Sequence, residues 1–74
     1  MKKIVMNDRE RIGGLLASIR ESKKLSLRQL AELSGVTSQN ITKIEKGKYN
    51  ASVDILSKIT DKLGCELTIT QKAT

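Results

Sequence analysis

The sequence predicts an all-α fold, in which a compact domain of four to five helices is followed by a short C-terminal β-strand. Two observations predict it. Apolar residues recur at helical spacing over residues 8–64, and the apolar spacing changes to two after Gly64. The 74 residues are enough for one domain. We therefore expect an N-terminal arm over residues 1–7, a helical domain over 8–64, and a strand and tail over 65–74.

The first helix is expected to begin after Asn7, because Glu10 three residues later completes a capping box. Apolar side chains then share one helix face at Ile12, Leu15, Leu16 and Ile19. Gly13 and Gly14 interrupt this helix, and each costs about 1 kcal/mol relative to alanine. We infer that the fold needs close approach or flexibility at these glycines, and that the helix ends near Lys23.

The second helix is expected to start at a capping box formed by Ser26 and Gln29 and to end at Gly35. Its apolar residues are Leu27, Leu30, Ala31 and Leu33. One residue separates Gly35 from Thr37, which is placed to cap the next helix. The two helices are therefore expected to be joined by a tight turn.

The third helix is expected over residues 38–46 and ends at Gly47, which is placed for a positive φ. Its inward positions are Ile41 and Ile44. Ser52 is expected to cap a fourth helix, which Gly64 ends. The apolar stripe of the fourth helix consists of Val53, Leu56, Ile59 and Leu63.

Apolar and polar residues alternate after Gly64. The apolar set is Cys65, Leu67 and Ile69, and the polar set is Glu66, Thr68 and Thr70. This spacing predicts a single strand. Because a lone strand cannot satisfy its own backbone donors and acceptors, we expect it to pair with the same strand of a second copy or with residues 3–5 of its own chain.

The composition disfavours several classes of function. Histidine is absent and Cys65 is the only cysteine, so we expect no metal site, no cofactor and no enzyme activity. Tyr49 is the only aromatic residue, which disfavours base stacking on single strands or RNA. Since no long apolar run occurs, we expect a soluble, cytoplasmic protein with no membrane partner.

The net charge is +6, and positive charge gathers in the middle of the chain. Between residues 20 and 48 lie seven basic residues and three acidic ones. A basic patch attracts polyanions and is typical of nucleic-acid binding, although ordinary solvated lysines give the same composition.

Residues 27–44 combine into one recognisable pattern. Ala31 lies four residues before Gly35, and apolar residues lie one, six and nine residues after this glycine. A small residue lets two helices cross closely, and the glycine lets the chain turn sharply. The pattern predicts a helix-turn-helix, whose second helix lies across the DNA major groove.

Residues 12–64 resemble the lambda-repressor/Cro family, also called the xenobiotic-response-element type. The matching stretches are Ile12-Gly13, Ile19-Arg20, Leu30-Ala31-Glu32-Leu33-Ser34-Gly35-Val36-Thr37, Ile41-Thr42-Lys43-Ile44-Glu45-Lys46-Gly47 and Leu63-Gly64. The resemblance implies four or five packed helices, a dimer bound to double-stranded DNA, and control of transcription.

The resemblance also implies roles for individual residues. The residues that would read bases are Ser38, Gln39, Asn40 and Lys43; Gln39 suits adenine and Lys43 suits guanine. The residues that would bind phosphate are Thr37, Lys46, Lys48 and Asn50. Arg20 and Glu45 would form a structural ion pair between the first and third helices. Many relatives have a phosphate-binding glutamine where this chain has Leu27, and Arg28 is a candidate to replace that contact.

The C-terminus departs from phage repressors, which usually continue into a fifth helix. It resembles a subset that includes HipB-type antitoxins, in which C-terminal strands pair across the dimer axis. Cys65, Leu67 and Ile69 would then form a homodimer interface, and the DNA site would be palindromic. The leading hypothesis is a dimeric repressor; an antitoxin with a toxin protein as partner, and a protein-interaction module without specific DNA binding, are the alternatives.

Overall fold

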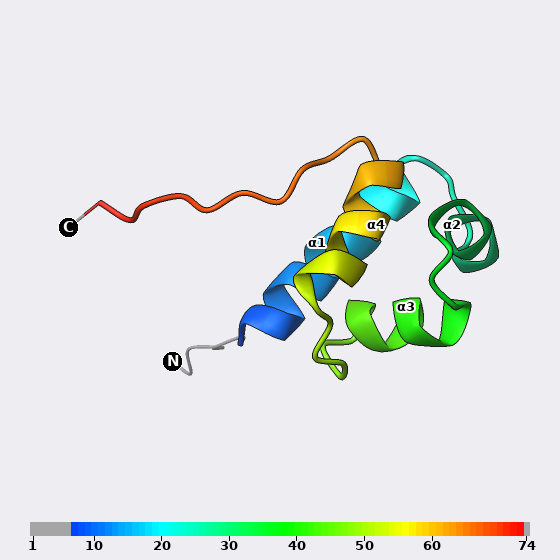
Figure 1. Ribbon diagram of the computed structural model, residues 1–74, viewed down its shortest axis with the longest axis horizontal. Helices are drawn as coiled ribbons and strands as arrows, with labels where there is room; N and C mark the ends of the chain where they lie inside the picture. Colours follow the sequence, from blue (N-terminus) through cyan, green and yellow to red (C-terminus); the bar gives the residue numbers. More distant parts are fainter. Residues whose placement is uncertain (1–6, 74) are drawn as a thin grey trace, which may run out of the picture.

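A computed structural model describes residues 7–73 as four helices without a strand (Figure 1). They are α1 (Asp8–Ser22), α2 (Leu27–Ser34), α3 (Ser38–Glu45) and α4 (Val53–Lys62). Helix α3 packs against both α1 and α2, and α2 also packs against α4. The all-helical prediction is confirmed. Residues 1–6, which include most of the expected N-terminal arm and the candidate strand at 3–5, lie outside the described residues.

The described part of the chain contains no fifth helix and no C-terminal strand, so these two expectations are not supported. Residues 65–73 instead run as an extended segment away from the helices, as Figure 1 shows in orange to red. The physical reason is that a strand is defined by pairing, and residues 7–73 place no neighbouring strand beside this segment.

Each helix begins at the cap expected from the sequence. The side chains of Asn7, Ser26, Thr37 and Ser52 each accept a hydrogen bond from the backbone amide three residues later, at 2.9–3.2 Å. At Ser26 the capping box is complete, since its own amide donates to the Gln29 side chain at 2.8 Å. Caps of this kind contribute about 1 kcal/mol each, and they fix where the short helices start.

The core is a single cluster of seven buried apolar residues drawn from every helix and from the turn between α2 and α3. They are Leu16, Leu30, Val36, Ile41, Ile44, Ile59 and Leu63. Three residues expected on inward stripes are instead exposed, namely Leu15 by 54%, Leu33 by 50% and Val53 by 69%. The small domain leaves part of the apolar stripes of α1, α2 and α4 uncovered, so these three residues reach solvent.

Two glycines are required by the packing and the backbone. A Cβ atom at Gly13 would overlap with the carbonyl oxygen of Ile44, so α1 meets the end of α3 at a distance that only glycine permits. A Cβ atom at Gly14 would meet no neighbouring atom within 4 Å. Gly35 has φ 77°, which an L-residue with a side chain rarely adopts. The expectation of close approach thus holds at Gly13 and not at Gly14.

No helix within residues 7–73 is long and apolar enough to cross a membrane.

Candidate nucleic-acid interface

The turn between α2 and α3 holds the two helices in a fixed relation. Gly35 ends α2 in the left-handed conformation, and its amide donates to the carbonyl of Ala31 at 2.9 Å. Val36 is buried, and its amide donates to the Ser34 hydroxyl oxygen at 3.2 Å. Thr37 then caps α3. Because the turn is buried on one side and hydrogen-bonded on the other, α3 is presented rigidly at the surface.

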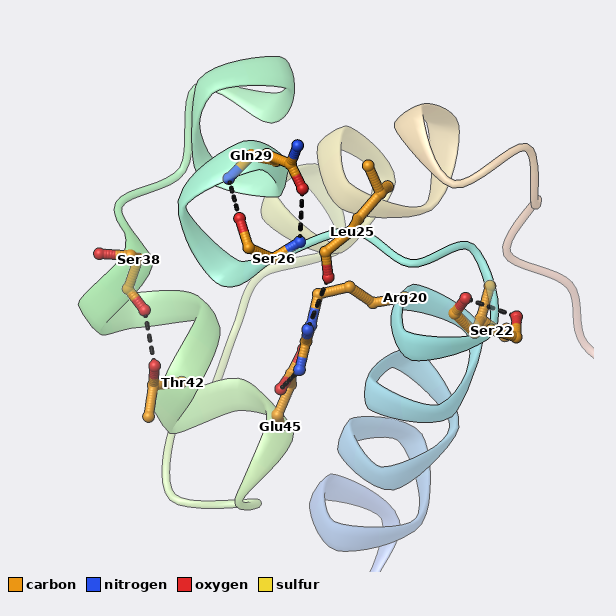
Figure 2. Close-up of polar contacts among 9 residues, drawn as sticks. Arg20, Ser22, Leu25, Ser26, Gln29, Ser38, Thr42 and Glu45 are labelled. Carbon is orange, nitrogen blue, oxygen red and sulfur yellow. Dashed lines mark hydrogen bonds and ion pairs between the residues drawn. The ribbon is translucent and has the colours of Figure 1, made fainter.

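The exposed face of α3 carries Gln39 and Lys43. These residues are four apart, so their side chains lie one above the other on the helix surface. Ser38 and Asn40 are partly buried. The Ser38 carbonyl accepts a hydrogen bond from the Thr42 hydroxyl at 2.8 Å (Figure 2). The arrangement leaves Gln39 and Lys43 as the freest base-reading candidates on the helix.

The candidate phosphate contacts lie at both ends of α3. Thr37 is at its start, and Lys46, Lys48 and Asn50 follow its end; all four are exposed. The Thr37 oxygen already accepts from the Asn40 amide at 3.2 Å, which leaves its hydroxyl proton available to donate. The backbone amide of Lys48 donates to the carbonyl of Lys43 at 2.8 Å and fixes the start of this loop.

Arg28 lies apart from α3, on the exposed surface of α2. Its side chain is 89% exposed and lies 3.4 Å from the Glu32 carboxylate, which is 68% exposed. An ion pair this exposed contributes little and holds neither side chain firmly. Arg28 is therefore free to turn toward an anion.

Arg20 and Glu45 form the shortest ion pair among residues 7–73. Arg20 Nε lies 2.7 Å from Glu45 Oε2, and its Nη2 lies 3.0 Å from Oε1, while the two side chains are only 13% and 11% exposed. The third donor, Nη1, reaches the Leu25 carbonyl at 2.8 Å. Figure 2 shows Arg20 spanning from α1 to the end of α3. The hydrogen bond with Glu45 raises the pKa of Arg20, and burial opposes this rise.

This ion pair also shapes the charge of the candidate interface. Glu45 is the only acidic residue between Thr37 and Val53, and Arg20 neutralises it. The three lysines of that stretch, at 43, 46 and 48, are all exposed. The surface around α3 therefore carries uncompensated positive charge, which is the electrostatic requirement for binding a polyanion.

Two features of the site escaped sequence reasoning. The Leu25 carbonyl accepts the third hydrogen bond of Arg20. Every residue has a backbone carbonyl, so the identity of residue 25 could not predict this contact. The Thr42 hydroxyl turns back onto the Ser38 carbonyl, and threonine in a helix offers only a general tendency to do so.

Comparison with known families decides what this scaffold is. The family HTH_3, described as helix-turn-helix, matches residues 16–69. This chain belongs to the HTH_3 family. The match includes all of α2, α3 and α4, and the resemblance to lambda-repressor/Cro proteins is confirmed. Neither the family nor its relatives support the narrower HipB-type resemblance.

Relatives of this HTH_3 domain are named as transcriptional regulators rather than enzymes. An uncharacterised HTH-type transcriptional regulator of Mycobacterium tuberculosis is 42% identical over 51 residues, which is 69% of this chain and 36% of the relative. The HTH-type transcriptional regulator SlrR of Bacillus subtilis is 41% identical over 58 residues, which is 77% of this chain and 38% of SlrR. The chain thus spans little more than a third of these relatives.

Two solved structures share both fold and length with this chain. The clp gene regulator ClgR of C. glutamicum superposes with a TM-score of 0.82 at 32% identity, covering 89% of this chain and 85% of that one. The restriction-modification controller protein C.AhdI of Aeromonas hydrophila superposes with a TM-score of 0.77 at 32% identity, covering 80% and 89%. Both proteins are named for regulating or controlling other genes or systems.

Proposed function

We propose that this HTH_3 domain binds a specific double-stranded DNA sequence as a homodimer and represses transcription in the cytoplasm. The observation that carries the proposal is the surface around α3. Gln39 and Lys43 project from a firmly packed helix, and side chains that could bind DNA phosphates lie at both of its ends. The nearby carboxylate of Glu45 is neutralised by Arg20. The similarity to the clp gene regulator ClgR supports the proposal.

The side chains divide into two roles. Gln39 can form two hydrogen bonds with adenine and Lys43 can donate to guanine, and both contacts depend on sequence. Lys46, Lys48 and Asn50 contact phosphates, which position the domain without reading bases. Ser38 and Asn40 are proposed to contribute at the edge of the base-reading set.

The homodimer is proposed to form through Cys65, Leu67 and Ile69. Leu67 is 40% exposed and Ile69 is 98% exposed in the single chain, so both offer apolar area to a partner. A two-fold dimer presents two copies of α3 to DNA, and their spacing of about one duplex turn, roughly 34 Å, calls for a palindromic site.

The test is to select binding sites from a random duplex library and measure affinity for the best sequence by fluorescence anisotropy. Gln39→Ala is expected to weaken binding by about 1–3 kcal/mol and to relax preference at one base pair in each half-site. Lys48→Ala is the matched control: it should weaken all duplexes equally and make the salt dependence shallower. Failure to enrich any sequence, or unchanged preference in Gln39→Ala, contradicts the proposal.

A further inference from the structure

An open apolar groove lies between α1 and the C-terminal segment, away from α3. The apolar residues of its floor on α1 are Ile12, Leu15, Leu16 and Ile19, beside Asp8 and Arg11. Its other wall is formed by residues 65–70 and Lys72. Three of the five large apolar residues that the described chain exposes lie here, at Leu15, Leu67 and Ile69. The groove therefore combines unburied apolar area with an extended backbone that pairs with no other segment among residues 7–73.

The inward face of this segment is set at its first residue. Cys65 packs against the core, and its thiol lies 3.5 Å from the Leu63 carbonyl. In an extended chain side chains alternate, so odd-numbered residues of 65–73 share the face of Cys65 and even-numbered residues take the other. In an antiparallel pair, directly opposite residues point to the same face of the sheet. The apolar residues of two copies therefore share one face only when even-numbered residues lie opposite even-numbered residues and odd-numbered residues lie opposite odd-numbered ones.

One such register is complementary in charge. When two copies pair about Ile69, Glu66 of each copy lies opposite Lys72 of the other, Thr68 lies opposite Thr70, and Leu67 lies opposite Gln71. Pairing about Thr68 leaves Glu66 facing Thr70. The Ile69 register alone gives two opposite-charge pairs and places β-branched side chains together on the axis. Such cross-strand pairs contribute about 0.2–1 kcal/mol each.

We propose that the occupant of the groove is the C-terminal segment of a second copy, paired antiparallel about Ile69, with the apolar face of the ribbon packed on Leu15 of both subunits. This inference rests on the proposed homodimer. It adds the register of the two strands and the surface of α1 on which they pack. An isolated two-stranded ribbon is marginal in water and needs a helix to pack against. The exposed side of α1 supplies that helix.

A cysteine scan measures the register directly. In a Cys65→Ser background, single cysteines replace residues 67, 68, 69, 70 and 71 in turn, and disulfide-linked dimer is quantified after mild oxidation. Paired Cα atoms at the axis lie about 4.5–5.5 Å apart, within disulfide range. Each step from the axis separates the two copies by about 7 Å more along the ribbon. Ile69→Cys is expected to cross-link best; a maximum elsewhere, or a flat profile, overturns the proposal.

The packing of the paired segments on α1 is tested by Leu15→Gln, with Leu33→Gln as the matched control. Both leucines are about half exposed, but only Leu15 lines the groove. Sedimentation is expected to show at least a tenfold weaker dimer for Leu15→Gln and no change for Leu33→Gln. Equal effects of the two variants reject packing on α1. If the wild-type dimer binds its operator but the cross-linking profile is flat, only the pairing about Ile69 is rejected. If the profile has its maximum at residue 69 but no specific DNA binding is found, only the proposed DNA binding is rejected.

Discussion

Replacing Arg20 with methionine removes three hydrogen bonds from a site almost closed to water. The Glu45 carboxylate, 11% exposed, then lacks its partner, and the Leu25 carbonyl loses its donor. Loss of one partner from a buried ion pair costs about 3–5 kcal/mol. Since both side chains retain some contact with water, we expect the lower end, about 3 kcal/mol. For a domain of this size that corresponds to a fall in Tm of roughly 12–24 °C.

The companion variant Glu45→Gln keeps the shape of the site and removes the charge. Arg20 still donates to Leu25 and to the new amide oxygen, so we expect a loss of about 2 kcal/mol. The double variant removes the stranded carboxylate as well as the arginine, and it should be at least about 1 kcal/mol more stable than the sum of the single losses implies.

The assay is urea unfolding followed by far-ultraviolet circular dichroism at one protein concentration, because dimerisation alters apparent stability. The pair raises the pKa of Arg20, so on the alkaline side of neutral pH its contribution persists until the pH rises through that raised pKa. Strictly additive losses in the double-mutant cycle would show that the two side chains do not act together.

Three further changes test the backbone. Gly13→Ala is expected to destabilise the domain by about 2 kcal/mol or more, because its Cβ would meet backbone atoms of α3 that cannot move independently. Gly14→Ala is expected to stabilise it by up to about 1 kcal/mol, since the position is open and helical; equal unfolding midpoints for the two variants would contradict this contrast. Lys24 has φ 58°, so Lys24→Gly is expected to raise the free energy of unfolding by up to about 1 kcal/mol, and a lower unfolding midpoint would show that the lysine side chain itself is needed.

The sequence predicted the helix boundaries well because the signals are local. A cap such as Ser26 acts on an amide three residues away, and Gly35 supplies a left-handed turn by its own lack of a Cβ atom. These local signals, together with the small residue at Ala31, were enough to predict a helix-turn-helix. The DNA contacts of individual side chains come from the family resemblance and remain predictions.

Other features depend on parts of the molecule that are far apart in sequence, and only the tertiary structure decided them. Periodicity placed Leu15 on the apolar face of α1, but whether that edge is covered depends on which helices pack beside it. Gly13 and Gly14 look alike in sequence, and they differ because the end of α3 meets only one of them. The strand after Gly64 was expected from alternation, yet a strand exists only with a neighbour, and the described part of the chain provides none. Hydrogen bonds between residues close in sequence can therefore be predicted from the sequence. Burial, close approach of helices and strand pairing depend on distant residues, so only the tertiary structure shows them.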